Sequence, residues 1–230
     1  MRAVILAAGR GSRMGEATAD VPKAFLEIGG RTLYDRQREV LDDYVDGITV
    51  VLGYQAENAR RHLSSADEIV LDRWDEFDNA ESLRRALVRI DDDVLVLNGD
   101  VLVSPAVLDR LVGRYETLAG ECNVVGCLAG VQDEHTAIRS DDAGRVVEYG
   151  QIAGNRHAGV GIVSRQHRGR ALTVLARNRR DWYPHVYPAT PTKRVVLPDD
   201  AHVEINRPRD LARARARLPF AARPERDAVR

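Results

Sequence analysis

The first thirty residues constrain the fold of this chain more than any other stretch. Ala3 to Ala7 form a short apolar run with β-branched members, which predicts a buried parallel strand, and the glycine-rich segment AGRGSRMG follows directly. Glycine adopts left-handed backbone conformations and lets N–H groups approach a polyanion, while Arg13 and Lys23 add cationic donors. We interpret the segment as a phosphate-binding loop. The simpler alternative is a tight turn between a strand and a helix.

Length and charge favour one large α/β domain. The 230 residues can bury a sizeable core, and 34 Lys and Arg against 35 Asp and Glu leave a formal charge of -1. This balance argues against nucleic-acid or membrane-surface binding as the main task, so any cationic site must be local. There is no apolar run of about 18 residues and no signal-peptide pattern, so we expect a cytoplasmic protein. Cys122 and Cys127 are expected to be free core thiols.

The rest of the chain alternates short apolar strands with amphipathic helices. This alternation predicts an α/β fold with a largely parallel sheet, in which ligands bind beyond the carboxyl ends of the strands. A hairpin is expected at residues 136–149, with its turn at 141–144. We expect further strands at 48–52, 69–71, 93–98, 123–129, 157–163 and 194–197, and helices at 33–44, 55–63, 78–90, 105–115, 171–180 and 210–218.

Asp100 is the candidate metal ligand. It follows the apolar strand VLVLN and Gly99, so it should lie at the ligand-binding edge of the sheet. Mg²⁺ prefers oxygen ligands and usually takes one or two carboxylates together with substrate phosphates. One Asp with help from a second residue would therefore suffice. The alternative is that Asp100 caps the helix that begins at Pro105.

The segments LAAGRGSRMG, residues 6–15, and PKAFLEIGG, residues 22–30, resemble the signature of the sugar-nucleotidyltransferase superfamily. The glycine spacing does not match the dinucleotide-binding pattern. The resemblance implies a Rossmann-like, three-layer α/β/α nucleotidyltransferase fold with a mixed central sheet and a small β-arm over the acceptor site. It covers residues 1–218, and residues 219–230 are expected to form a flexible C-terminal tail. Enzymes of this superfamily join a nucleoside triphosphate to a phosphorylated alcohol or sugar.

The resemblance also implies roles for single residues in nucleotide binding and transfer. Arg13 would stabilise the β- and γ-phosphates, and Lys23 would bridge the α-phosphate and the acceptor phosphate, so both are the predicted catalytic residues. Asn79, followed by Ser82 and Leu83, resembles the cytidylyltransferases that act on phosphocholine, inositol phosphate and aminoethylphosphonate, although a plain helix cap is the alternative. The predicted nucleotide-binding residues are Leu6, Ala7, Ala8, Gly9, Gly11, Ser12, Arg13, Asn79, Ser82 and Asp100.

The acceptor and metal sites are inferred from the second half of the chain. The predicted acceptor-binding residues are Lys23, Glu148, Gly159, Trp182 and Tyr183. Trp182, Tyr183 and Tyr187 could form an aromatic cage for a cationic alcohol or could pack under a lid or at a subunit contact, and Glu148 could be an exposed hairpin charge. Asn206 stands where the superfamily has its second metal-binding Asp; its carbonyl can bind Mg²⁺ but adds no charge.

The resulting expectation is a Mg²⁺-dependent nucleotidyltransferase that joins an NTP, favouring CTP, to a phosphorylated alcohol, sugar alcohol or phosphonate and releases pyrophosphate. The alternatives within the fold are a hexose-1-phosphate uridylyl- or thymidylyltransferase and a guanylyltransferase of the molybdenum-cofactor type. A noncatalytic nucleotide sensor is supported only by Asn206, and a glycosyltransferase would need a first carboxylate where Asn98 stands. The expected partners are the nucleotide and a phosphorylated small molecule, without nucleic acid or membrane, and a homo-oligomer is compatible with the sequence.

Overall fold

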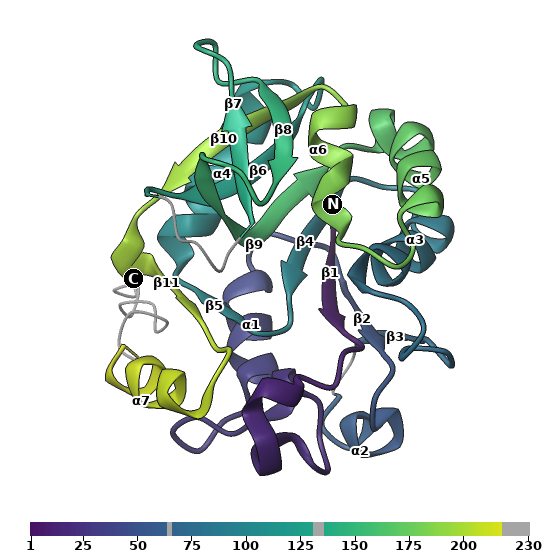
Figure 1. Ribbon diagram of the computed structural model, residues 1–230, viewed down its shortest axis with the longest axis vertical. Coiled ribbons are helices and arrows are strands. Elements are labelled where there is room, and N and C mark those ends of the chain that lie inside the picture. Colours follow the sequence, from purple (N-terminus) through teal and green to yellow (C-terminus); the bar gives the residue numbers. More distant parts are fainter. Residues whose placement is uncertain (64–65, 131–135, 218–230) are drawn as a thin grey trace, which may run out of the picture.

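A computed structural model describes residues 1–63, 66–130 and 136–217 of the chain. Its centre is a mixed sheet with the strand order β10-β6-β9-β4-β1-β2-β3, and a β7–β8 hairpin extends from β9 at the top of Figure 1. These strands are β1 (Arg2–Ala7), β2 (Ile48–Leu52), β3 (Asp67–Val70), β4 (Val94–Asn98), β6 (Asn123–Leu128), β7 (Ala137–Ser140), β8 (Val146–Gly150), β9 (Asn155–Val163) and β10 (Thr192–Leu197). A separate antiparallel pair joins β5 (Val101–Val103) to β11 (His202–Glu204).

Helices cover both faces of the sheet. They are α1 (Leu33–Leu41), α2 (Ala56–Arg60), α3 (Asn79–Arg89), α4 (Pro105–Thr117), α5 (Arg168–Arg177), α6 (Val186–Ala189) and α7 (Pro208–Ala216). Because side chains alternate along a strand, β1 contributes Ala3, Ile5 and Ala7 to one buried cluster and Val4 and Leu6 to another. The first cluster includes side chains of α1 and α4, and the second includes side chains of α3, α5 and α6. The expected three-layer α/β/α architecture is therefore confirmed (Figure 1).

The strand registers explain where a site can form. β1 is parallel to β2 and β4, and β9 runs antiparallel between β4 and β6. Leu6 is the partner of Asn98, so the segments that follow β1 and β4 leave the sheet side by side. Gly99 N–H donates to Leu6 O at 2.9 Å, and a Cβ on Gly99 would lie only 2.8 Å from that oxygen. Glycine is thus needed at Gly99 to bring the two segments together.

Several boundaries differ from the sequence-based expectation. The helix expected to end at Tyr44 ends at Leu41, and the one expected over 55–63 is the shorter α2, which Gln55 enters with a left-handed φ of 50°. Ser104, not Asp100, is the residue before α4, so Asp100 is not its cap. The expected tail at 219–230 lies outside the described residues.

The two cysteines are both free thiols. Cys127 is buried in β6, whereas Cys122 precedes that strand. In the described ranges, no helix has both the length and the apolar character needed to cross a bilayer.

Candidate active site

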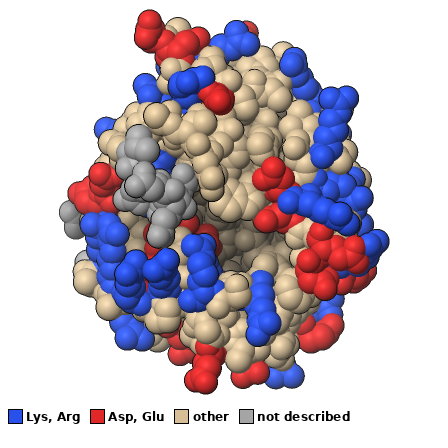
Figure 2. Space-filling model, viewed as in Figure 1, with Lys and Arg blue, Asp and Glu red and all other residues tan. Residues whose placement is uncertain are grey.

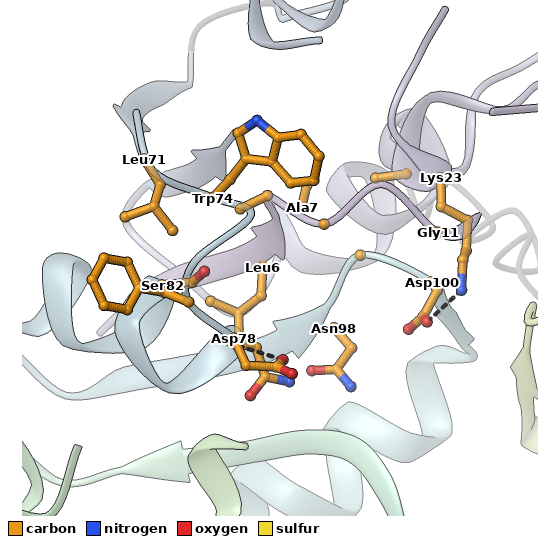
Figure 3. Close-up of a pocket in the computed structure, with 16 residues that line it drawn as sticks. Leu6, Ala7, Gly11, Lys23, Leu71, Trp74, Asp78, Ser82, Asn98 and Asp100 are labelled. Carbon is orange, nitrogen blue, oxygen red and sulfur yellow. Dashed lines mark hydrogen bonds and ion pairs between the residues drawn. The ribbon is translucent and has the colours of Figure 1, made fainter. Parts of the chain in front are cut away.

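Two adjoining cavities lie at the carboxyl ends of β1 and β4, where Figure 2 shows this face of the molecule hollowed near its centre. The first, of about 190 Å³, is drawn in Figure 3. The second, of about 480 Å³, lies toward β9 and the segment that follows α5. Asp78, Asn79, Asn98 and Asp100 line both cavities, so a molecule in one would lie next to a molecule in the other.

The glycine-rich loop forms one wall of the first cavity. Leu6, Ala7, Ala8, Gly9 and Gly11, all predicted nucleotide-binding residues, line it. Gly11 has a left-handed φ of 67°, and a Cβ there would lie 3.0 Å from Cε of Lys23. Glycine therefore serves two purposes at this position: it permits the turn and leaves room for the lysine.

Lys23 connects the predicted catalytic and metal-binding residues. It follows Pro22 in a short helical turn and is only 9% exposed. Nζ donates to Asp100 Oδ2 at 2.9 Å and to Asn206 Oδ1 at 3.2 Å, and Arg13 Nη2 donates to the same Asn206 oxygen at 2.8 Å. Asp100 and Asn206 are held together by the hydrogen bond from Ile205 N to Asp100 O, beside the β5–β11 pair. Four residues far apart in the sequence thus form one cluster.

The oxygens of this cluster fit a hard cation. Asp100 Oδ1 and Asn98 Oδ1 are buried and have no hydrogen-bond partner among the residues that the structure describes, which is costly unless a ligand satisfies them. Asn206 Nδ2 donates to Glu204 Oε1 at 2.7 Å, which orients its carbonyl oxygen toward Lys23 and Arg13. No group of three His, Cys, Asp or Glu side chains suited to a metal occurs within the described ranges. Carboxylate and amide oxygens are ligand types that Mg²⁺ accepts, so Asp100 and Asn206 are the residues that could hold it together with substrate phosphates.

The N-terminus of α3 forms the opposite wall. Asn79 and Ser82, two of the predicted nucleotide-binding residues, line the first cavity. The first N–H groups of α3 are already hydrogen-bonded, because Ala80 N donates to Asp181 O and Glu81 N donates to Asp78 O. Asp78 caps the helix by accepting from Asn79 N at 2.7 Å, and its burial raises the pKa of this carboxyl. Asn79 Oδ1 accepts from Tyr183 N at 2.8 Å. The Asn79 side chain thus lines both cavities and also links the start of α3 to the segment that contains Tyr183.

Sequence reasoning missed the apolar part of the first cavity. Leu71, Trp74 and Phe77 line it. The sequence pattern predicts residues 72–77 only as the loop between the strand at 69–71 and the helix at 78–90. Trp74 packs edge-on against Tyr54, with ring centroids 5.2 Å apart, and a Cβ on Gly53 would lie 2.5 Å from Trp74 Cβ. The available signal was the concentration of aromatic residues after β3 in a chain with only 5% aromatics.

The second cavity contains most of the predicted acceptor residues. Gly159, Trp182 and Tyr183 line it, as do Thr136 and Tyr149 at the base of the β7–β8 hairpin. Gly159 has a φ of 68°, and a Cβ there would lie 2.9 Å from a methyl group of Val101. Trp182 is 41% exposed, and its Nε1 donates to Asp78 Oδ2 at 3.2 Å. Tyr187, in contrast, is fully buried outside the lining, so it packs in the core and forms no part of an aromatic cage.

Two histidines, His157 and His202, lie beside the second cavity. His157 lines the second cavity, and its Nε2 lies 3.3 Å from the hydroxyl oxygen of Tyr183. Burial, with a smaller contribution from His202, lowers the pKa of His157 to about 3. His202 Nε2 donates to Ala158 O at 2.8 Å, and burial lowers its pKa to about 4. Both imidazoles are therefore neutral near pH 7.

Two predicted residues lie outside both linings. Ser12 begins the short helix Ser12–Thr18 and faces neither cavity lining. Glu148 pairs with Arg139 across the β7–β8 hairpin. The structure thus places Ser12 next to the site and Glu148 on the hairpin, and their proposed contacts with nucleotide and acceptor stay predictions.

Comparison with known proteins identifies the relatives of this chain. The model of a family described as the MobA-like NTP transferase domain matches residues 3–196. CMP-5'-(3-aminopropyl)phosphonate synthase of Streptomyces rubellomurinus is 33% identical over 168 residues, 69% of this chain and 26% of the relative. The bifunctional protein GlmU of Thermotoga maritima is 29% identical over 151 residues, 64% of this chain and 33% of the relative. The chain thus spans about a quarter to a third of the length of these curated relatives.

Two solved structures share the fold. CTP:phosphocholine cytidylyltransferase from Streptococcus pneumoniae superposes with a TM-score of 0.75 at 16% identity, covering 94% of this chain and 97% of the other. The inositol-1-phosphate CTP transferase from T. maritima superposes with a TM-score of 0.76 at 20% identity, covering 96% of this chain and 95% of the other. The mixed sheet and its flanking helices are therefore those of a nucleotidyltransferase fold.

Proposed function

Because the chain belongs to the MobA-like NTP transferase family, we propose that it transfers a cytidylyl group from CTP to a phosphorylated alcohol, sugar alcohol or phosphonate and releases pyrophosphate. The observation that carries the proposal is the position of Lys23, Asp100 and Asn206 where the two cavities adjoin. A lysine, a carboxylate and an amide oxygen at such a junction suit the meeting of two phosphates and a divalent cation.

The proposed reaction needs positioning and charge neutralisation more than a covalent catalyst. An oxygen of the acceptor phosphate or phosphonate attacks the α-phosphorus, and a new P–O bond forms. The bond from the α-phosphorus to the bridging oxygen breaks, and its electron pair leaves with pyrophosphate. Lys23 is placed to neutralise the α-phosphate and the acceptor phosphate, and Arg13 to neutralise the leaving group. Asp100 and Asn206 would hold Mg²⁺, which supplies further screening of the phosphate oxygens.

The preference for CTP rests on similarity. The name of the Streptomyces relative is that of a CMP-phosphonate synthase, and two structural neighbours are named for CTP. Asn79 and Ser82, which resemble the cytidylyltransferase pattern, line the first cavity at the N-terminus of α3. We therefore assign the first cavity to CTP.

We assign the second cavity to an acceptor with a cationic group. Trp182 offers an exposed aromatic ring next to the Asp78 carboxylate, and its Nε1–H donates to that carboxylate. An ammonium group is attracted both to an aromatic face and to a carboxylate. Lys23 lies at the Asp100 and Asn206 end of the site, where the two cavities adjoin and where it suits the acceptor phosphate. This arrangement favours an amino alcohol phosphate or an aminophosphonate over an uncharged sugar phosphate.

A panel assay tests the proposal. The protein is incubated with Mg²⁺, each of CTP, UTP, GTP, ATP and dTTP, and phosphocholine, aminoethylphosphonate, inositol phosphate, glycerol phosphate or a hexose-1-phosphate, and pyrophosphate release is measured. We expect the fastest release with CTP and a cationic acceptor. Lys23→Ala and Asp100→Ala should each lower the rate of release by roughly 100-fold or more, while Lys193→Ala, which removes the other lysine of the chain, should leave it unchanged.

The other outcomes distinguish the alternatives. Release only with a hexose-1-phosphate would assign the chain to sugar activation and overturn the acceptor proposal. Nucleotide binding measured by calorimetry without release from any pair would support the sensor interpretation, and Asn206→Asp is then the variant to assay.

A further inference from the structure

The walls of the two cavities are tied to each other on the side away from the catalytic cluster. Phe77 lines the first cavity, Asp78 and Asn79 line both, and Trp182 and Tyr183 line the second. Hydrogen bonds join the backbones of the two segments: Asp78 N donates to Arg179 O at 3.0 Å, and Ala80 N donates to Asp181 O at 3.2 Å. We call these contacts between residues 77–81 and 179–183 the clasp.

Arg179 is the central side chain of the clasp. Its guanidinium lies over the Phe77 ring, 4.1 Å from the ring centroid, and its Nε donates to Glu81 Oε2 at 2.8 Å. Phe77 lines the nucleotide cavity, but neither Arg179 nor Glu81 is among the residues that line the two cavities. The Arg179 side chain therefore contacts Phe77 of the first cavity from outside that cavity. Its backbone carbonyl accepts from Asp78 N at the beginning of the segment that leads to Trp182.

Glu81 is a fully buried carboxylate with three arginine partners. Arg84 and Arg85 reach it from within α3, and Arg179 reaches it from the other segment. A buried charge is costly without partners, so this glutamate provides a strong anchor for a cation. Two of its partners belong to its own helix. Loss of Arg179 would therefore leave Glu81 paired, and the main effect would fall on the position of residues 179–183.

We propose that Glu81 and Arg179 are positioning residues that fix the Trp182 wall of the acceptor cavity and couple it to the nucleotide cavity through Phe77. The assignment of the cavities rests on the proposed function above. A nucleotide that packs against Phe77 and Asn79 would reduce the motion of the N-terminus of α3. Through the contacts of the clasp, it would also reduce the motion of Trp182. The acceptor then meets a cavity wall that nucleotide binding has already stabilised.

Arg179→Gln and Arg85→Gln form a matched pair for the test. Each removes one cation from Glu81, but only Arg179 crosses to the second segment, and Arg85 is 49% exposed. We expect Arg179→Gln to raise the KM of the acceptor roughly tenfold, as for loss of one charge-assisted hydrogen bond, and to change the Kd of CTP about twofold or less. Arg85→Gln should change neither quantity. Equal effects of the two variants on acceptor KM would overturn the proposal.

A second readout does not depend on turnover. The chain has two tryptophans, so Trp74→Phe leaves Trp182 as the only one. In that background we expect Arg179→Gln, but not Arg85→Gln, to increase quenching of Trp182 fluorescence by acrylamide, and CTP to protect Trp182 less than in the parent. This result would hold even if the panel assay found no acceptor, so failure of the clasp and failure of the proposed function are distinguishable.

Folding of the variant is checked by circular dichroism. If Arg179→Gln does not fold, Arg179→Lys serves in both assays, because lysine keeps the charge but loses the planar guanidinium that lies on Phe77 and bonds Glu81. Quenching and acceptor KM equal to those of Arg85→Gln in the folded Arg179 variant would show that Trp182 is positioned without the clasp.

Discussion

Nζ of Lys23 lies 2.9 Å from Oδ2 of Asp100, although the two residues are 77 positions apart in the chain. The lysine comes from the segment after the glycine-rich loop, and the aspartate follows β4. Lys23 also donates to Asn206, so one ammonium group neutralises the oxygens proposed to bind Mg²⁺. Lys23 is thereby held where the two cavities adjoin, so its charge is available to a phosphate group bound there.

Lys23→Ala should lower kcat by roughly 100-fold or more with a smaller effect on the KM of CTP, because the charge acts on the transition state. Steady-state kinetics of pyrophosphate release measure both constants. Lys193→Ala, on the surface strand β10, is the matched control. A change confined to KM would show that Lys23 binds the ground state only.

Asn206→Asp should strengthen metal binding. The new carboxylate would add a charged ligand beside Asp100. It would lose the 2.7 Å hydrogen bond to Glu204, but it would keep Arg13 and Lys23 as cationic partners of the same oxygen. We expect the increase in Tm on adding Mg²⁺ with CTP to exceed that of the wild type. Thermal unfolding with and without Mg²⁺ measures this. An unchanged response to Mg²⁺ would show that residue 206 is not a ligand.

The sequence predicted the layers and most strands because these depend on local signals. Apolar runs ending in glycine located β1 and β4, and parallel pairing then required their ends to meet. The cluster of Arg13, Lys23, Asp100 and Asn206 followed from resemblance, and the structure brings all four together.

The remaining features depend on tertiary contacts that have no local signal. Arg179 and Glu81 are 98 residues apart, and in the sequence each resembles an ordinary surface charge on a helix. Tyr187 and Tyr183 have similar sequence surroundings, yet only Tyr183 lines the acceptor cavity. Which aromatic side chain faces a cavity depends on how α6 packs on the sheet, and sequence pattern alone does not specify that packing.

Acid should weaken the fold between pH 7 and pH 5 through the buried histidines. Their pKa values, about 3 for His157 and about 4 for His202, lie below the usual value of about 6.5, so the unfolded chain binds protons that the folded chain excludes. This stability is complete above pH 6.5 and is lost as the pH falls toward the folded pKa values. Each histidine contributes a slope of up to ~1.4 kcal/mol per pH unit. Urea unfolding at several pH values measures the slope.

His202→Gln should reduce that slope, because glutamine does not titrate and can still donate to Ala158 O. The carboxylate of Glu81 does not interfere in this range. Burial alone would raise the pKa of Glu81, but the hydrogen bonds from Arg84, Arg179 and Arg85 lower it to about 2, so its contribution is lost only below about pH 4.5.

Gly11→Ala and Gly113→Ala should change stability in opposite directions. Gly11 has a left-handed φ of 67°, and a Cβ there would lie 3.0 Å from Cε of Lys23, so alanine would strain the backbone by about 1–2 kcal/mol and displace the lysine. Gly113 lies in α4, where an added Cβ would meet no described atom within 4 Å beyond its chain neighbours and the adjacent helix backbone, so alanine should stabilise the helix by up to ~1 kcal/mol. Thermal unfolding measures both effects. Only Gly11→Ala should also lower kcat, since it alone moves Nζ of Lys23 away from Asp100, and a Gly11→Ala variant with wild-type kcat would mean that the loop tolerates that displacement.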